Sequence, residues 1–373
     1  MKNEIVYPDY NNSILEIPNS ILKYCGVVPK HKTSPVLDEY LKKDYKNVIV
    51  MLFDGMGIDC IQDNLPTKDS IFHANKKQDM HSVFLCTTTA ATTSMRTALS
   101  PIEHGWLGWS CYFKELDKLV NIFMNDDGVK CDGVPVAEYD VARKYMPYKE
   151  IFQLINEQGN GTKACSVSRF GMIQIDDLDG LFSKTKTLCN DDEKRFIYTY
   201  WGEPDHLMHV NGCYDYSVKE AVVDIQKRVE KFTQDVEDTL IIVTADHGLL
   251  DSTVKVINHY PEINDCLRHP VGLEPRCNSF YIKDGMIDKF VELFKKEFGD
   301  QYILFTKDEF IKKEFLGPGK PHPKSYDFLG DIIAVAVGDI AIWNDNGADK
   351  IFKALHAGMT EKEMMVPLIV LET

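Results

Sequence analysis

Five short segments of this chain carry residue types that bind metal ions or attack phosphorus. They are Asp54-Gly-Met-Gly57, the threonines at 87–89, Asp205-His-Leu-Met-His209, Asp246-His247-Gly248 and His356-Ala-Gly358. Carboxylates and imidazoles are ligands that Zn²⁺ accepts readily. A hydroxyl at the start of a helix lies where backbone N–H groups favour an anion. Together the segments offer six oxygen and nitrogen ligands and one hydroxyl nucleophile, a composition that fits a two-metal centre for phosphoryl transfer.

Each segment alone also has an ordinary structural explanation. Asp54 could only form a turn or cap the next helix, and one of the threonines could be a simple N-cap. Asp205 and His209 could be a solvated pair on a helix face, and the other two segments could be polar turns. Their joint occurrence, in the order Asp, Thr, Asp-x3-His, Asp-His, His, favours the chemical interpretation.

The elements that must position these residues are short apolar runs alternating with helical patterns. Strands are predicted at Asn47–Phe53, Thr162–Val167, Phe196–Tyr200, Leu240–Thr244 and Ile332–Val337, with a strand-like stretch at Met80–Leu85 before the threonines. Helical spacing occurs in Tyr148–Asn156 and Ser217–Phe232. This alternation predicts a largely parallel α/β sheet. Open α/β sheets bind ligands at the carboxyl ends of their strands, which is where the carboxylates lie.

Residues 258–330 differ in composition from the rest of the chain. They hold several prolines, strand-like runs at Ser279–Ile282 and Tyr302–Phe305, a helix-like run at Asp288–Phe298, and a Gly/Pro-rich passage at Gly317–Pro323. We interpret 258–330 as a small α+β lobe inserted into a single domain that spans residues 1–373.

Composition excludes several classes of protein. With 44% hydrophobic and 27% charged residues, the chain of 373 residues is expected to fold around a sizeable core. A net charge of −15 argues against a nucleic acid polymer as partner. No apolar stretch is long enough for a membrane helix, and no signal peptide is evident. The ten cysteines include no C-x-x-C pair and suggest reduced thiols in a cytoplasmic protein.

In their order and spacing these segments resemble the alkaline phosphatase superfamily, in particular bacterial intracellular members of its type I phosphodiesterase/nucleotide pyrophosphatase branch. The matching motifs are FDGMG at 53–57, TTTAATTSMRTALSPIEHG at 87–105, DHLMH at 205–209, TADHG at 244–248 and HAGMTEKEMMVPLIV at 356–370, with a further likeness over 105–121. The resemblance implies an alkaline-phosphatase-like core, with a mostly parallel sheet between helices, and two zinc ions, with manganese as the alternative metal.

The resemblance also implies a role for each matching residue. One zinc would be held by Asp54, Asp246, His247 and the Thr88 hydroxyl, and the second by Asp205, His209 and His356. The family's nucleophile falls on Thr88, rather than on Thr87 or Thr89, and a phosphothreonine intermediate is implied.

This chain departs from the family at one position that touches the substrate. Animal nucleotide pyrophosphatases carry, three positions after the nucleophile, an Asn that holds a phosphate oxygen, and Ala91 occupies that position here. Arg96 or Arg169 could supply the missing donor, although a salt-bridged role on a helix is the alternative for Arg96. Trp106 and His322 are further candidate substrate contacts, against core packing and a surface loop as their alternatives.

The expected activity is hydrolysis of phosphodiester or nucleotide pyrophosphate bonds in a small phosphorylated substrate, with nucleotides among the candidates. The alternative is a phosphomonoesterase or phosphonate hydrolase on the same scaffold. A sulfatase is disfavoured because no Cys/Ser-x-Pro-x-Arg motif is present. A non-catalytic metal-binding protein is disfavoured because all seven expected positions are filled. We expect a monomer or homodimer.

Overall fold

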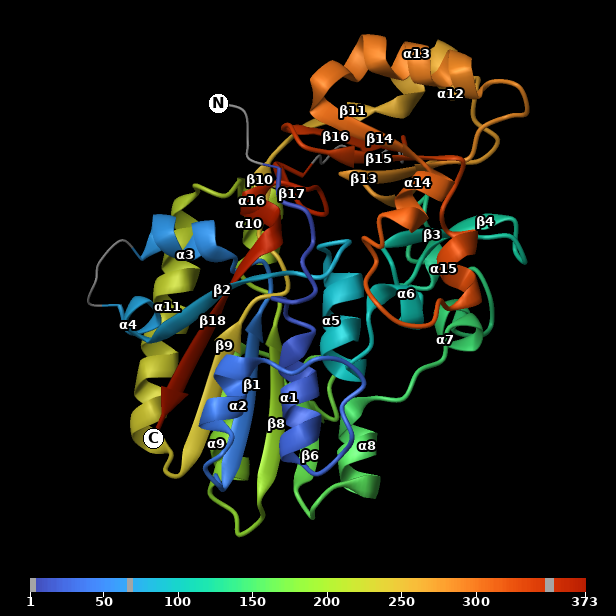
Figure 1. Cartoon of the computed structure of the whole chain (residues 1–373). Coiled ribbons are helices and arrows are strands. Elements are labelled where there is room, and N and C mark those ends of the chain that lie inside the picture. The colour runs from blue at the N-terminus through green and yellow to red at the C-terminus, as the bar shows by residue number, and fades with distance from the viewer. Residues whose placement is uncertain (1–4, 66–69, 346–351) are drawn as a thin grey trace.

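The predicted ligand segments all adjoin one large sheet. The computed structural model describes residues 5–65, 70–345 and 352–373. In the described part, seven strands follow the order β2 (Lys76–His81), β18 (Met365–Glu372), β9 (Thr239–Thr244), β1 (Asn47–Phe53), β8 (Arg195–Trp201), β6 (Lys163–Ser168) and β7 (Ile173–Gln174). The pairs from β9 to β7 are all parallel, and β18 runs antiparallel to both of its neighbours. In Figure 1 this sheet fills the lower part of the molecule.

The burial of the central strand β1 explains why its continuous apolar sequence predicted a strand. Every residue of β1 is buried, because β8 and β9 flank the strand and helices cover the sheet. Strand β1 has the predicted bounds, and the runs at 196–200 and 240–244 lie within β8 and β9. The mostly parallel α/β sheet predicted from the alternating pattern is therefore confirmed.

Helices cover the sheet in two groups. On one side α1 (Glu16–Tyr24), α5 (Thr88–Thr97) and α8 (Ile151–Gln158) contact one another, and on the other α11 (Tyr216–Asp235) contacts α3 (Ile58–Asn64), α4 (Ile71–Asn75), α9 (Leu178–Cys189) and α10 (Asp205–Asn211). The remaining α-helices are α2 (Pro35–Tyr40), α6 (Pro101–His104), α7 (Val141–Tyr145), α12 (Pro261–Asn264), α13 (Ile287–Phe298), α14 (Lys307–Lys312), α15 (Pro323–Asp327) and α16 (Glu361–Met364). None of the described helices is both long and apolar enough to cross a membrane.

A second sheet, in the upper right of Figure 1, is antiparallel throughout. Its order is β14 (Tyr302–Thr306), β15 (Ile332–Ala336), β13 (Cys277–Phe280), β12 (Gly272–Glu274), β3 (Ser110–Phe113), β4 (Lys118–Asn121) and β5 (Asp126–Asp127). Thus β3, β4 and β5 come from residues before the segment 258–330, and β15 comes from residues after it. Two small ladders, β10 (Leu250–Asp251) with β17 (Ala354–Leu355) and β11 (Thr253–Val256) with β16 (Ile340–Trp343), complete the strands of the described part.

Two expectations about individual strands need correction. The run at 332–337 forms a strand, β15, but it belongs to the second sheet, where β13 and β14 pair with its two edges. A fully buried antiparallel strand has the same continuous apolar pattern as a parallel one, so the sequence could not separate them. The strand expected at 80–85 ends at His81, where pairing with β18 ends. Residues 82–87 continue as a buried loop toward α5.

Candidate functional site

The three aspartates predicted as ligands meet at the carboxyl edge of the first sheet. Asp54 directly follows β1, Asp246 lies just beyond β9, and Asp205 begins α10 after β8. Because β9, β1 and β8 are adjacent and parallel, their carboxyl ends lie side by side. Gly55 makes the close approach possible, since its φ is +70° and an added Cβ would lie 2.9 Å from the Asp205 Cα. The glycine after Asp54 therefore brings two of the carboxylates together.

One group of potential metal ligands consists of Asp54, Asp246 and His247, whose ligand atoms all lie within 4.8 Å of one another. His247 Nε2 lies 3.5 Å from Asp54 Oδ1 and 3.6 Å from Asp246 Oδ2. The backbone N–H groups of Gly55 and His247 both donate to Asp246 Oδ1 at 3.1 Å. The other oxygen, Asp246 Oδ2, is buried without a hydrogen-bond partner among the described residues, as expected for an atom that binds a cation.

The Thr88 hydroxyl lies against this first group. Thr88 is the first residue of α5, and its Oγ1 is 3.2 Å from His247 Nε2 and 3.5 and 3.4 Å from the two Asp54 oxygens. The Thr87 hydroxyl instead donates to Glu274 Oε1 at 2.6 Å. Thr89 Oγ1 is buried without a partner in the described part. Of the three threonines, Thr88 is the one whose hydroxyl lies against Asp54 and His247.

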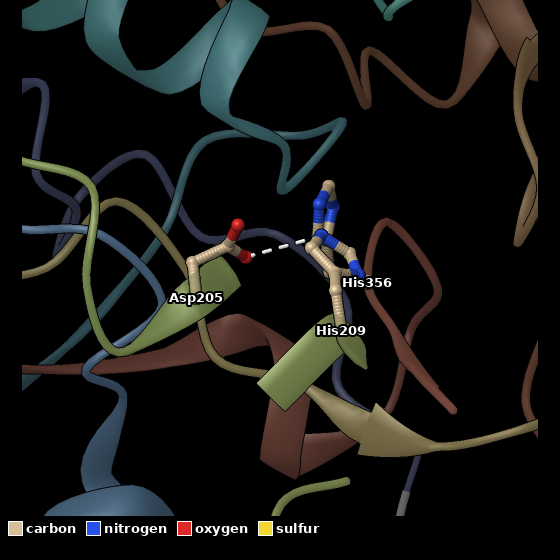
Figure 2. Close-up of side chains that lie close together, drawn as sticks. All are labelled: Asp205, His209 and His356. Carbon is tan, nitrogen blue, oxygen red and sulfur yellow. Dashed lines mark ion pairs between the residues drawn. The ribbon is translucent and has the colours of Figure 1, made fainter. Parts of the chain in front are cut away.

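The second group consists of Asp205, His209 and His356, again within 4.8 Å of one another. Figure 2 shows the three side chains converging, with the ion pair between Asp205 Oδ1 and His209 Nε2 at 3.3 Å. His209 Nδ1 donates to the Ala354 carbonyl at 2.7 Å, which orients Nε2 toward Asp205. The His356 ring stacks on that of His247 with centroids 3.9 Å apart, so the two groups adjoin. Apart from its ion pair with His209, Asp205 Oδ1 has no partner in the described part, and His356 Nδ1 is buried there without a hydrogen bond.

The buried carboxylates at this edge of the sheet create an electrostatic environment that favours bound cations. Burial raises the pKa of Asp54, and the neighbouring carboxylates of Asp246 and Asp205 raise it further. Burial opposes ionisation of Asp205 as well, but His209 beside it holds its pKa below the usual value. Burial and the adjacent His247 lower the pKa of His356 well below normal, which keeps that imidazole neutral. Three crowded carboxylates, a neutral imidazole and the unpartnered buried oxygen of Asp246 are a donor set that fits two divalent ions.

Two residues at the site, Tyr200 and Glu274, were not predicted from the sequence. Tyr200, the penultimate residue of β8, donates its hydroxyl hydrogen bond to Asp54 Oδ2. The sequence signal that could have indicated Tyr200 is its position, since it carries a hydroxyl near the end of a strand that pairs with β1. Glu274 accepts hydrogen bonds from Thr87 and from the Trp109 backbone N–H, and burial raises its pKa to about 7. It comes from the second sheet, and no local pattern could have connected it with the threonines.

A cavity of about 570 Å³ opens beside the ligand groups. Thr88, Asp205, His209 and His356 are among the residues that line it. Residues of the second sheet and of the strands next to it also line the cavity, among them Trp109 and Trp343. Phe352 adds a third aromatic ring, which stacks on that of His209 with centroids 4.6 Å apart. The Thr88 hydroxyl and the ligand groups are therefore accessible to a small molecule.

The three predicted substrate contacts Arg96, Trp106 and His322 do not line this cavity. Arg96 forms an ion pair with Glu150 at 2.5 Å. Trp106 is buried and donates its Nε1 hydrogen bond to the Met146 carbonyl at 3.0 Å. His322 caps α15 through Nδ1. The structure thus brings together the seven predicted ligand and nucleophile positions and gives these three side chains other partners.

Arg169 and Ala91, the two other positions considered from the sequence, are also located. Arg169 donates to the Asp176 carbonyl at 3.2 Å and faces the Trp201 ring. Ala91 is fully buried in α5 and packs in the core under the first sheet. Neither lines the cavity, whereas Trp109 does.

Solved structures of known proteins have a fold similar to that of this chain. In structure the chain is similar to murine ectonucleotide pyrophosphatase/phosphodiesterase 5, with a TM-score of 0.62 and 16% identity over 87% of this chain and 88% of that one. An inactive variant of the murine protein in complex with AMP matches equally well, with a TM-score of 0.62 and 16% identity over 87% of each chain. Phosphonoacetate hydrolase from Sinorhizobium meliloti, in complex with phosphonoacetate, has a TM-score of 0.62 and 15% identity over 86% of this chain and 89% of that one.

These solved structures share the fold, and those relatives bind small phosphorylated or phosphonate ligands. The chain matches no curated protein sequence. Residues 48–359 match the family model for type I phosphodiesterase / nucleotide pyrophosphatase, and this span includes every predicted ligand and the nucleophile position. The chain therefore belongs to the type I phosphodiesterase / nucleotide pyrophosphatase family, within the alkaline phosphatase superfamily.

Proposed function

We propose that this protein is a two-zinc hydrolase that cleaves phosphodiester or nucleotide pyrophosphate bonds through a phosphothreonine at Thr88. The observation that carries the proposal is the position of Thr88 Oγ1, which lies 3.2 Å from His247 Nε2 and lines the cavity. A hydroxyl held among metal-ligating groups, at the first turn of a ten-residue helix, is placed to attack phosphorus.

The residues that would hold the ions follow from the two groups. Asp54, Asp246, His247 and the Thr88 hydroxyl would bind one ion, and Asp205, His209 and His356 the other. The mixed oxygen and nitrogen donors suit zinc, with manganese as the alternative. When bound, two divalent ions supply positive charge that lowers the pKa of the attacking hydroxyl and neutralises charge on the phosphate.

In the proposed mechanism Thr88 acts as a covalent nucleophile, and the reaction takes place in two displacements at phosphorus. Thr88 Oγ1 loses its proton and forms a bond to phosphorus while the bond from phosphorus to the leaving oxygen breaks. The leaving oxygen departs with one proton, which balances the proton that Thr88 lost. Water then attacks the phosphothreonine, the bond from Oγ1 to phosphorus breaks, and Thr88 regains its proton. Two in-line displacements give net retention of configuration at phosphorus.

A phosphonate hydrolase is the second candidate function, and a phosphomonoesterase would use the same scaffold. The specific observation in favour of the phosphonate candidate is the structural similarity to phosphonoacetate hydrolase, whose TM-score of 0.62 is the same as that of the pyrophosphatase. We place the protein in the cytoplasm as a monomer or homodimer, and the location is supported by ten cysteines that all lack a disulfide.

A substrate panel on the zinc-loaded protein tests the proposal. It compares bis(4-nitrophenyl) phosphate, 4-nitrophenyl phosphate, a nucleotide pyrophosphate and phosphonoacetate. We expect the diester or the pyrophosphate to have the highest kcat/KM. We expect Thr88→Ala to lower that activity by about a thousandfold or more with zinc content intact, while the neighbouring control Thr89→Val keeps it. Undiminished turnover by Thr88→Ala would exclude the nucleophile, and preference for phosphonoacetate would select the second candidate.

A further inference from the structure

The cavity wall outside the ligand groups has an electrostatic character that the proposed function does not use. We propose that this wall selects the organic group on the phosphate, and that it prefers a group that is cationic or rich in hydrogen-bond donors to an anionic one. The inference rests on the proposed function, because it concerns the substrate held beside Thr88. It names a substrate class within that function.

Glu274 contributes a buried carboxyl group to this wall. This carboxyl group lines the cavity, is 5% exposed and forms no salt bridge with a lysine or arginine of the described part of the chain. Its Oε1 accepts hydrogen bonds from Thr87 Oγ1 and the Trp109 N–H, both at 2.6 Å. Uncharged donors alone leave a buried carboxylate incompletely compensated. A cation or a strong donor beside it favours the ionised form, whereas an anionic group must overcome its charge or force its protonation.

Asp126 places a second carboxylate on the same wall. It is 3% exposed and is held by Asn121 Nδ2 at 2.9 Å and the Gly133 N–H at 3.0 Å. Apart from the ligand groups, the other ionisable side chains among the described lining residues are His206 and Cys131. No lysine or arginine is among those lining residues, so the described wall offers an anionic substituent no permanent positive charge.

The remaining lining suits an apolar body with a donor at its end. Trp109, Trp343 and Phe352 present aromatic rings, whose faces attract cations. Asn278 also lines the cavity, and its Nδ2 donates to the carbonyls of Glu274 at 2.9 Å and Ile342 at 3.1 Å. Its Oδ1 has no partner among the described residues and adds a buried acceptor beside Glu274. An alkylammonium or amine-bearing group matches this combination, and a carboxylate does not.

Three diesters of similar size test the inference. Each carries 4-nitrophenol as the measured leaving group, and the second ester group is 3-aminopropyl, butyl or 2-carboxyethyl. We expect kcat/KM to fall from the amino to the carboxy compound by about tenfold or more, because like charges brought together in an enclosed site repel. Glu274→Gln and Asp126→Asn should each shrink that ratio several-fold, and the exposed control Glu297→Gln should leave it unchanged. Equal or better turnover of the carboxy compound, or a ratio unchanged in both cavity variants, would overturn the inference.

Failure of the proposed function is distinguishable from failure of this inference. If none of the three diesters is hydrolysed, diester hydrolysis is wrong, and binding decides the inference. Calorimetry on the zinc-loaded Thr88→Ala variant then compares 3-aminopropyl phosphate with 2-carboxyethyl phosphate. Tighter binding of the amino compound supports the selective wall, and equal or weaker binding overturns it. If all three diesters are hydrolysed at one rate, the function stands and the inference falls.

Discussion

Arg276 and Glu363 form a fully buried ion pair. This pair connects the second sheet to the loops that hold His247 and His356. Arg276 Nε lies 2.6 Å from Glu363 Oε1, and Nη2 lies 2.8 Å from Oε2. Glu363 Oε1 also accepts the Gly358 N–H at 2.7 Å, and its backbone carbonyl accepts the Gly248 N–H at 2.9 Å. Gly248 follows His247, and Gly358 lies two residues after His356. One carboxylate residue therefore positions the chain beside a predicted ligand of each ion.

Glu363→Gln should lower the free energy of unfolding by about 3–5 kcal/mol, because it leaves the Arg276 charge buried and unpaired. Urea unfolding monitored by circular dichroism measures the loss. The exposed neighbour Glu361→Gln is the matched control and should be nearly neutral. The double variant Arg276→Met with Glu363→Met should lose less than the sum of its single variants. A change below about 1 kcal/mol in Glu363→Gln, the size of an exposed pair, would contradict a structural role for the pair.

Asp205→Asn and Asp246→Asn should each remove one of two bound ions. Each variant takes a carboxylate from one ligand group and leaves the other group complete. Metal content by mass spectrometry after gel filtration measures the outcome, with the exposed Asp63→Asn as control. A chelator should lower the Tm of the wild-type protein, since ions bound only by the folded state stabilise it. Full metal content in both variants would rule out the predicted ligand sets.

Tyr200→Phe should weaken zinc binding by about 10–100-fold, because the Tyr200 hydroxyl orients the Asp54 carboxylate. Competition with a chromophoric chelator measures the affinity. Tyr198 on the same strand provides a close control, since its buried hydroxyl has no hydrogen-bond partner among the described residues. Tyr198→Phe should keep wild-type affinity. Equal effects of the two substitutions would show that the Tyr200 hydrogen bond does not act on the metal site.

Glu16 should make the protein less stable as the pH rises. Burial raises its pKa from 4.5 to about 7, although Lys32 Nζ lies 3.4 Å from Oε1. Because the folded state then binds a proton more tightly than the unfolded state, this contribution to stability is lost as the pH rises from about 4.5 to 7. Urea unfolding at pH 5 and pH 8 should show a smaller loss in Glu16→Gln than in wild type. The exposed Glu39→Gln should follow wild type, and parallel behaviour of all three proteins would refute the assignment.

Local sequence patterns predicted the first sheet well. Buried runs such as Asn47–Phe53 are recognisable because continuous apolar residues bounded by turns have few other uses. The aspartates that end these runs were identifiable because parallel strands bring their carboxyl ends to one edge. The same local logic failed for Ile332–Ala336, whose composition fits either sheet.

The sequence by itself determined the ligand types, their order and the strands that bring them together, since each of these depends on residues close in the chain. Only the tertiary structure decided what surrounds them. It showed that the Thr88 hydroxyl lies against His247 whereas Thr87 bonds Glu274, and that Tyr200 bonds Asp54. It also showed that Glu274 reaches the cavity from a strand 186 positions beyond Thr88. It also directed Arg96, Trp106 and His322 to other partners. Side-chain contacts between distant segments arise from packing of the two sheets, and no local periodicity encodes them.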